Sequence, residues 1–250
     1  LAEEARRAEI ARQSDALKSA LLASVSHDLR TPLASIRAYA GTLMDDEVRL
    51  DPDEARASAA AIDREAQRLN RLVTNLLDLG RIEGGALRPA LEALDAEDVV
   101  ASAVTHAEPR IEQRPLAVEV EPGTTVLADA VLLEEILVNL LENAVRHTPD
   151  GTAIRVAAGE LEPGTIGITV EDAGPGVPDD ALPHLFETFY RVPGRGTAAG
   201  RGTGVGLAVV RGFVAALGGT ARARRGDLGG LAVDLQLPAA APAALDTVPA

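Results

Sequence analysis

The chain has 250 residues and no cysteine, which excludes disulfides and thiolate metal sites. Its hydrophobic fraction of 46% is that of a globular protein, and its aromatic fraction of 2% predicts a core of aliphatic side chains. The net charge of −14 lies mostly after residue 90, and such an acidic half argues against nucleic acid as a partner.

The first predicted element is one long helix over residues 3–44. Apolar side chains recur at spacings of four and seven over residues 10–29, which is the pattern of an amphipathic helix. Pro32 is expected to interrupt and bend this helix, because proline removes one backbone hydrogen bond. No apolar run approaches the roughly 20 residues that cross a membrane.

A second helix is predicted over residues 54–83, with Asp53 as its N-terminal cap and Gly84-Gly85 as its end. Its apolar stripe follows the whole helix. Two such helices form a hairpin whose apolar faces cannot cover each other, so we expect two hairpins to build a dimeric four-helix bundle. The alternative is that the stripe packs on the second half of the chain.

The second half alternates between helix and strand patterns after a linker at residues 86–94. Helices are predicted over residues 95–114, 130–147 and 204–217. Strands are predicted over residues 116–121, 125–128, 153–158, 165–171, 220–225 and 231–237. This order, with helices on one side, indicates an α/β sandwich. Residues 178–203 are predicted to be an irregular functional or mobile loop, and the Ala- and Pro-rich tail at residues 238–250 to be disordered.

The first chemical motif is Ser26-His27-Asp28-Leu29-Arg30-Thr31-Pro32-Leu33. The neutral imidazole of His27 is a good nucleophile near neutral pH. The carboxylate of Asp28 can hold the other ring N–H and stabilise the cation that forms on attack. Thr31 follows one helical turn later on the same face. A His-Asp pair alone also fits an ordinary polar helix face, so the downstream motifs decide between the two interpretations.

Three downstream motifs predict a nucleotide site. Asn139 and Asn143 lie at i and i+4 on one helix face, and an amide oxygen suits Mg²⁺, which keeps waters and phosphates as its other ligands. Asp172 follows a strand pattern and can accept a hydrogen bond from an exocyclic amine. Gly174 and Gly176 come next and allow the backbone to approach a flat base closely.

The third downstream motif is the glycine-rich segment at residues 200–207, which leads directly into a helix pattern. Backbone N–H groups at a helix N-terminus suit phosphate. The chain has one lysine, Lys18, so any cationic side chain at a phosphate must be an arginine.

Together these motifs resemble the sensor histidine kinases of bacterial two-component systems. The resemblance covers about residues 15–237. The matching boxes are SHDLRTPL at residues 26–33, NLLENA at 139–144, EDAGPGVP at 171–178, LFETFYR at 185–191 and RGTGVGL at 201–207.

The resemblance implies a domain order and a fold. We expect a signalling helix at residues 1–16, a dimerisation and histidine phosphotransfer domain at 17–85, a linker at 86–94, a catalytic ATP-binding domain at 95–237 and a disordered tail at 238–250. The catalytic domain would have the α/β sandwich shared with gyrase. We expect a cytoplasmic fragment, joined to a membrane or other sensor only through residues upstream of Leu1.

The resemblance also implies an activity, ATP:protein-histidine kinase. His27 would attack the γ-phosphate of ATP, and Asp28 would help to remove the ring proton. The phosphoryl group would pass to an aspartate of a response regulator receiver domain. Thr31 and Arg30 would act in the reverse, phosphatase direction; the alternatives are an ordinary helix hydroxyl and a solvated cation.

In the ATP site, the resemblance makes Asn143 the Mg²⁺ ligand and Asp172 the acceptor for the adenine amine. Glu135 would orient a metal-bound water, or it is a solvated helix glutamate. Arg146 would reach a phosphate, or it lies at the surface. Thr188 stands where the family often has a basic residue, which leaves Arg191 as the cation near ATP. The full set expected at ATP is Asn139, Asn143, Arg146, Asp172, Gly174, Gly176, Arg191, Gly202, Thr203, Gly204, Gly206 and Leu207.

Two hypotheses of other classes make different demands on the sequence. An ATPase of the same sandwich fold that drives a clamp needs no nucleophilic histidine on a helical hairpin, and His27 argues against it. A non-catalytic docking module would be expected to have lost Asn143, Asp172 or the glycines, and all are present.

Overall fold

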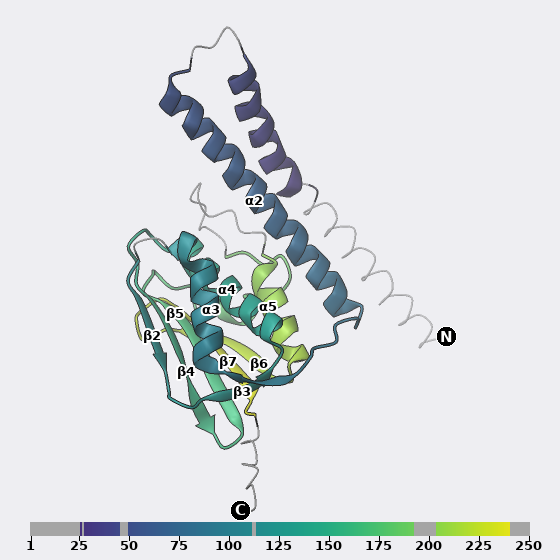
Figure 1. The fold of residues 1–250 in the computed structure, drawn as a ribbon, viewed down its shortest axis with the longest axis vertical. Coiled ribbons are helices and arrows are strands. Elements are labelled where there is room, and N and C mark those ends of the chain that lie inside the picture. The colour runs from purple at the N-terminus through teal and green to yellow at the C-terminus, as the bar shows by residue number, and fades with distance from the viewer. Residues whose placement is uncertain (1–25, 27, 46–49, 112–113, 193–203, 241–250) are drawn as a thin grey trace, which may run out of the picture. The chain divides into compact units, whose positions relative to one another are not determined.

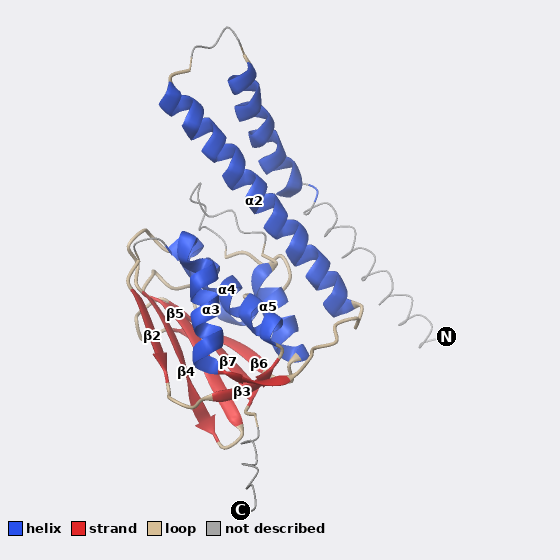
Figure 2. Cartoon of the chain, viewed as in Figure 1, coloured by secondary structure: helices blue, strands red, loops and turns tan. Residues whose placement is uncertain are grey.

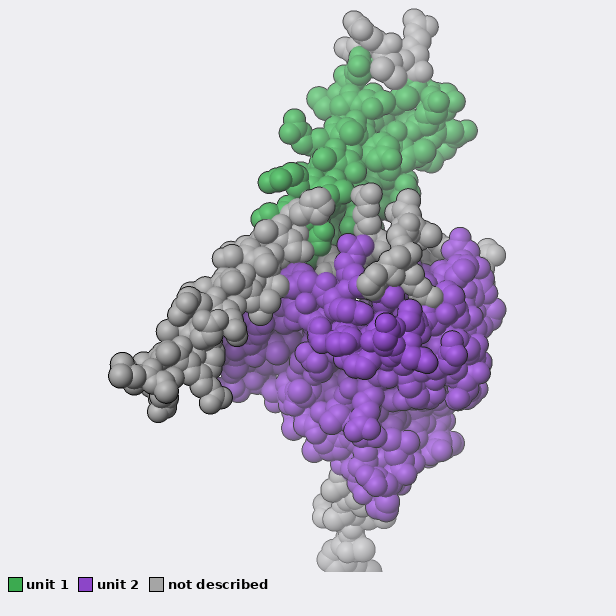
Figure 3. All heavy atoms as spheres, turned by 180° about the vertical axis from the view of Figure 1, so that it is seen from behind, with its two compact units in different colours: residues 1–77 green, residues 78–250 purple. Residues whose placement is uncertain are grey.

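The computed structural model describes residue 26 and residues 28–45, 50–111, 114–192 and 204–240. The chain divides into two compact units, Leu1–Leu77 and Asp78–Ala250, coloured separately in Figure 3. None of the helices in these described ranges combines the length and the apolar character that crossing a membrane requires.

The first unit contains a helix over residues 28–44 and most of helix α2 (Pro52–Glu83) (Figure 1). The first helix continues through Pro32, so the predicted interruption is wrong. A proline removes only one N–H donor, and the turns on either side keep their own hydrogen bonds. The predicted helix over residues 3–25 and His27 itself lie outside the described residues.

Helix α2 begins two residues earlier than predicted, and its cap is Asp51 instead of Asp53. The Asp51 carboxylate accepts hydrogen bonds from the backbone N–H groups of Asp53 (2.9 Å) and Glu54 (2.8 Å). Pro52 takes the first helical position, where its missing N–H costs nothing. The helix ends at Gly84-Gly85 as predicted, with Gly85 at a φ of 60°.

The second unit places three helices on one face of a five-stranded sheet, which confirms the predicted α/β sandwich (Figures 1 and 2). The sheet order is β2-β4-β5-β7-β6, and β2 runs parallel to β4 while the other pairs are antiparallel. The helices are α3 (Ala96–Ile111), α4 (Ala130–His147) and α5 (Gly206–Ala216), with a 3₁₀ turn η1 (Leu182–His184). The strands are β1 (Glu92–Asp95), β2 (Leu116–Val120), β3 (Thr125–Ala128), β4 (Ile154–Glu162), β5 (Thr165–Asp172), β6 (Thr220–Arg225) and β7 (Leu231–Pro238).

Two segments that the sequence left without structure are ordered. Strand β1 lies at the end of the expected linker and pairs with β3 in a separate two-stranded sheet. At the other end, Ala239 donates a backbone hydrogen bond to Gly164, and Ala240 donates one to Thr125. The predicted disorder is therefore wrong for residues 238–240, because backbone pairing holds them; residues 241–250 lie outside the described residues.

Strand β4 ends four residues later than predicted, because it continues to the tight turn into β5. That turn contains Pro163-Gly164, and Gly164 has a φ of 87°. Pairing of β4 with β5 continues to Glu162 with a register shift after Glu160.

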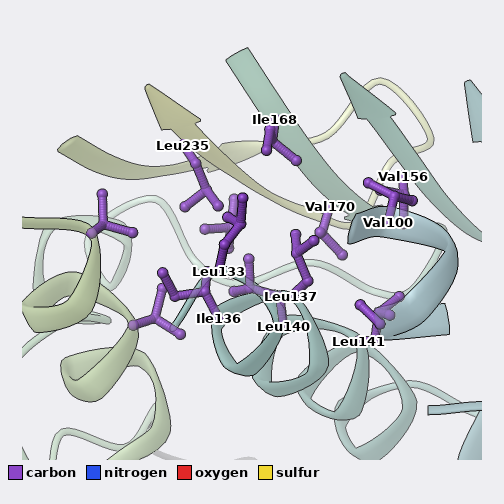
Figure 4. Close-up of a cluster of buried hydrophobic side chains, with 14 of the residues drawn as sticks. Val100, Leu133, Ile136, Leu137, Leu140, Leu141, Val156, Ile168, Val170 and Leu235 are labelled. Carbon is purple, nitrogen blue, oxygen red and sulfur yellow. The ribbon is translucent and has the colours of Figure 1, made fainter. Parts of the chain in front are cut away.

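The core of the second unit lies between α4 and the sheet. Side chains of α4 point toward Ile168 and Val170 of β5 and Leu235 of β7 (Figure 4). The fully or almost fully buried side chains on α4 are Leu133, Ile136, Leu137, Leu140 and Leu141. Burying each of these stabilises the fold by roughly 1.5–3 kcal/mol. This packing fixes which face of α4 remains available for polar side chains.

Candidate ATP-binding site

The polar face of α4 carries the first set of predicted site residues. Glu135, Asn139 and Asn143 recur every four residues and are all half-buried, beside the apolar stripe that holds the helix on the sheet. The amide nitrogen of Asn139 donates to the backbone carbonyl of Glu135 over 2.9 Å. Asp129 caps the helix by accepting from two backbone N–H groups. The row of side chains is therefore held in place along a single helix face.

The start of α5 lies opposite this row. A Cβ atom placed on Gly206, the first residue of α5, would have the amide oxygen of Asn139 as its nearest neighbour, at 3.8 Å. The structure thus brings together the helix of the two asparagines and the N-terminus of the helix that follows the glycine-rich segment. Gly202 and Thr203 of that segment lie outside the described residues.

Asp172 lies at the end of β5 and is 7% exposed. Its Oδ1 atom accepts hydrogen bonds from the backbone N–H groups of Gly174 (2.8 Å) and Leu231 (3.4 Å). A Cβ atom at Gly174 would lie 2.5 Å from the Thr148 methyl group and 2.7 Å from the Asp172 carboxylate. Glycine is therefore required beside this carboxylate, because any side chain would meet Thr148 and Asp172. The predicted approach of this backbone to a base stays a prediction.

Gly204 and Gly176, also predicted at the site, have backbone conformations that favour glycine. Both have a positive φ, 69° at Gly204 and 62° at Gly176, a region that favours glycine. Leu207 packs partly buried against the core, and Arg191 is exposed.

Arg146 lies on the last turn of α4, where its guanidinium contacts the buried Glu142 carboxylate at 3.3 Å. The i,i+4 spacing explains the contact. The described structure therefore gives Arg146 a position at the edge of α4 with an acidic neighbour. Asp28 and Thr31 are half-buried on the helix of the first unit, and His27 lies outside the described residues.

Burial raises the pKa of Glu135 above its ordinary value of 4.5, and the carboxylate of Asp78 raises it further. Burial also raises the pKa of Asp78, while Arg81, 3.7 Å away, lowers it. The last turns of α2 thus bring a second acidic group near the α4 face. Asp78 was not predicted as a site residue. Its position within the apolar stripe of α2, between Leu77 and Leu79, is the sequence feature that could have indicated a buried carboxylate.

Arg114 is a second residue that sequence analysis missed. Its guanidinium donates to the Thr148 hydroxyl (2.8 Å), the Pro149 carbonyl (2.8 Å) and the Val145 carbonyl (3.1 Å). These contacts hold the C-terminal end of α4, where the Thr148 methyl group packs against Gly174. A single arginine before Pro115 forms no sequence pattern from which its contacts with the end of α4 could be inferred.

Among the residues that the structure describes, no three His, Asp or Glu side chains converge to form a metal site of their own. A metal at the α4 face would take most of its ligands from phosphate and water, as Mg²⁺ commonly does. The half-buried amide of Asn143 is a suitable oxygen donor for such an ion.

Two family profiles match the chain. The family described as "His Kinase A (phospho-acceptor) domain" matches residues 17–85, and "Histidine kinase-, DNA gyrase B-, and HSP90-like ATPase" matches residues 128–241. The chain belongs to the sensor histidine kinases. Its helical region followed by an α/β domain with a mixed sheet is the arrangement expected of that family.

Individual histidine kinases are similar over most of the chain. The sensor protein KdpD of Mycobacterium tuberculosis is 39% identical over 244 residues, 96% of this chain and 28% of the relative. The full-length ShkA structure in complex with AMPPNP is 29% identical with a TM-score of 0.63, covering 89% of this chain and 46% of ShkA. The Acinetobacter baumannii kinase AdeS is 25% identical with a TM-score of 0.66, covering 86% of this chain and 98% of the AdeS chain. This histidine kinase chain spans about a quarter of the length of its KdpD relatives.

Proposed function

We propose that the chain uses ATP to phosphorylate its own His27 and then passes the phosphoryl group to an aspartate of a response regulator. The observation that carries this proposal is the approach of Asn139 on α4 to Gly206 at the start of α5. It joins an amide row suited to a metal with a helix N-terminus suited to phosphate. The same chain carries the His27-Asp28 pair.

The proposed site holds ATP at two ends. The buried carboxylate of Asp172 would accept a hydrogen bond from the adenine amine, and two backbone N–H groups already fix its orientation. Asn143 would bind Mg²⁺, which neutralises charge on the phosphates when bound. Glu135 would orient a water of that ion, and Asn139 lies between them on the same face.

In the proposed transfer, a ring nitrogen of His27 forms a bond to the γ-phosphorus while the bond to the β–γ bridging oxygen breaks and ADP leaves. Asp28 holds the other ring nitrogen and accepts the proton that His27 loses. Such transfers depend on positioning and charge neutralisation. In the reverse direction, we propose that Thr31 and Arg30 assist removal of phosphate from the regulator.

The chain is proposed to act as a homodimer through residues 17–85. In the proposed domain order, a signalling helix at residues 1–16 precedes this region, and the catalytic domain at residues 95–237 follows it. The hairpin supports the homodimer, because large apolar side chains remain exposed along it. They are Leu33, Tyr39, Leu43, Met44, Val73 and Leu77. Association of two hairpins into a four-helix bundle would cover these side chains.

Calorimetry with two variants of the full chain tests the ATP site. Asp172→Asn introduces a donor toward the adenine amine, so ATP affinity should fall about ten- to a hundredfold with or without Mg²⁺. Asn143→Asp keeps the shape but changes the charge at the metal, so its defect should depend on Mg²⁺. Wild-type ATP affinity in Asp172→Asn would contradict the adenine assignment, and a defect of Asn143→Asp that ignores Mg²⁺ would contradict the metal assignment.

A further inference from the structure

Glu171 is a fully buried carboxylate directly before Asp172. Its side chain is 0% exposed. Successive residues of a strand point to opposite faces, and Val170 points into the core beside α4, so Glu171 points to the opposite face of the sheet. A buried charge must be paired and hydrogen-bonded to be tolerated. The partners of Glu171 therefore show what the side chain is for.

Two partners satisfy Glu171, one on each oxygen. The guanidinium of Arg155 on β4 donates to Oε2 over 2.5 Å, and the backbone N–H of Leu228 donates to Oε1. Leu228 lies in the loop that joins β6 to β7, residues 226–230. Arg155 also approaches Asp227 of this loop at 3.4 Å, but Asp227 is 73% exposed, so this second contact contributes little. The main link between β5 and the loop is Glu171.

The loop approaches β5 so closely that only glycine fits at two of its positions. A Cβ atom on Gly226 would lie 2.4 Å from the Glu171 carboxylate. A Cβ atom on Gly230 would lie 2.2 Å from both the carbonyl oxygen and the carboxylate of Asp172. Neither glycine has a positive φ. Glycine is therefore required at both positions because the loop packs closely on the two acidic residues, Glu171 and Asp172.

The residue that follows the loop binds Asp172. Leu231, which follows the loop, donates its backbone N–H to Asp172 Oδ1 over 3.4 Å. One carboxylate of β5 thus holds the middle of the loop, and the next carboxylate accepts a hydrogen bond from its end. Release of Leu228 from Glu171 would free the segment that supplies one of the two N–H donors to Asp172.

We propose that Glu171 is a positioning residue of the nucleotide site, which holds the β6–β7 loop against Asp172 and so fixes the acceptor for the adenine base. This inference rests on the proposed role of Asp172 in ATP binding. The Arg155–Glu171 pair lies on the sheet face away from the helices, and we expect it to affect how tightly the protein binds the adenine base.

The test compares Glu171→Gln with wild type in the full chain, at a temperature well below the unfolding of either. Glutamine has one acceptor oxygen and one NH2 donor, so it cannot accept from both Arg155 and Leu228 as the two carboxylate oxygens do. The link to the loop is therefore weakened, and the KM for ATP in autophosphorylation should rise about three- to tenfold. The kcat at saturating ATP should stay unchanged, because no group that contacts phosphate is altered. Amide hydrogen exchange should become faster in residues 226–231 while α4 keeps its protection.

Asp234→Asn is the matched control. Asp234 lies on the same sheet face and accepts hydrogen bonds from Thr169 (2.8 Å) and Arg224 (2.7 Å). Its replacement removes an ion pair of the same sheet face, although a more exposed one (29% for Asp234 against 0% for Glu171). Asp234 has no contact with Asp172, so the KM for ATP should not change. An equal rise of KM in Asp234→Asn and Glu171→Gln would overturn the proposal, because it would indicate a general loss of sheet stability.

A double variant keeps the proposal testable if Glu171→Gln does not fold. Glu171→Met with Arg155→Met removes both charges, which avoids leaving one buried and unpaired, and still deletes the acceptor for Leu228. The KM for ATP should again rise with kcat unchanged. A wild-type chain that binds no ATP in calorimetry would overturn the proposed function as well, whereas a wild type that binds ATP and Glu171 variants with wild-type KM would overturn this inference alone.

Discussion

The backbone N–H of Phe189 donates a hydrogen bond to the carbonyl of Gly204 over 2.7 Å, and both residues have a positive φ, 67° and 69°. Such a φ is unfavourable for phenylalanine and persists only where surrounding contacts enforce it. This contact joins the phenylalanine-containing stretch before residue 193 to the segment that begins α5. The start of α5 is therefore held by a strained residue outside the helix.

Gly204→Ala is predicted to weaken ATP binding as well as the fold. Alanine at a positive φ costs about 1–2 kcal/mol, and its Cβ atom would lie 2.7 Å from the carbonyl carbon of Phe189. Relief of this clash must displace Phe189 or the start of α5. We expect a lower unfolding midpoint and a reduced affinity for ATP–Mg²⁺ in calorimetry.

Gly218→Ala is the control for this prediction. Gly218 has a φ of 79° but a Cβ atom there would meet its nearest neighbour only at 3.7 Å. Gly218→Ala should lose stability only through its positive φ, so less than Gly204→Ala, and it should keep wild-type ATP affinity. Equal ATP affinities in the two variants would show that the Phe189 contact does not matter for the site.

Arg114→Met is predicted to destabilise the catalytic domain by about 2–3 kcal/mol, because it leaves the Thr148 hydroxyl and the last α4 carbonyls without their charged donor. Arg114→Lys should recover only part of this, since an ammonium group cannot reproduce the planar fork of contacts. Urea unfolding measures both. The exposed Arg222 on β6 supplies the control: Arg222→Met should leave stability within about 0.5 kcal/mol of wild type.

The raised pKa of Glu135 predicts a pH-dependent effect of Glu135→Gln on stability. A carboxyl group whose pKa is raised by folding stabilises the fold fully below its unfolded pKa and loses this contribution as pH rises through the folded pKa. Glutamine mimics the neutral form at every pH. Denaturant unfolding should find Glu135→Gln more stable than wild type at pH 8, with the difference disappearing toward pH 4.

Asp78 gives this pH effect a second, independent check. Its carboxylate raises the pKa of Glu135, so the gain from Glu135→Gln at pH 8 should be smaller in an Asp78→Asn background. A gain in stability from Glu135→Gln that grows on acidification would contradict the electrostatic account of this face. A gain that is the same with Asp78 and with Asn at position 78 would contradict it as well.

Val73→Asp with Leu77→Asp is predicted to convert dimers into monomers in light scattering. These side chains on α2 are 44% and 64% exposed, and burying carboxylates in a bundle interface is unfavourable. Val131 on α4 is at least as exposed, at 65%, and belongs to the catalytic domain. Val131→Asp should leave the dimer intact, and a dimer that survives the α2 substitutions would exclude the bundle interface.

The elements with strong periodicity and a clear cap were predictable from the sequence. Helix α4 was predicted to the residue from its apolar periodicity, and the structure adds Asp129 as its N-terminal cap. Strand β1 was missed, since four residues without alternation are stabilised only by distant pairing with β3. The Asp51 cap was missed because two aspartates flank Pro52, and only the first leaves proline at the initial helical position.

The position of the two α4 amides on one helix face was predictable from their spacing of four residues. The site was not predictable where tertiary packing buries a charge. Glu171 and Asp78 are acidic residues of a kind that usually stay exposed, and only the fold shows that both are buried. His27, Gly202 and Thr203 lie outside the described residues, so their roles stay predictions.

The most direct test of the account is the incubation of wild type and two variants with γ-³²P-labelled ATP and Mg²⁺. Label should remain on the wild-type protein in an acid-labile, base-stable form, as a phosphohistidine requires. His27→Ala should bind ATP but retain no label, whereas Thr31→Ala should be labelled and dephosphorylate its response regulator more slowly. Label retained by His27→Ala, or release of free phosphate with no label on the wild type, would contradict phosphorylation of His27.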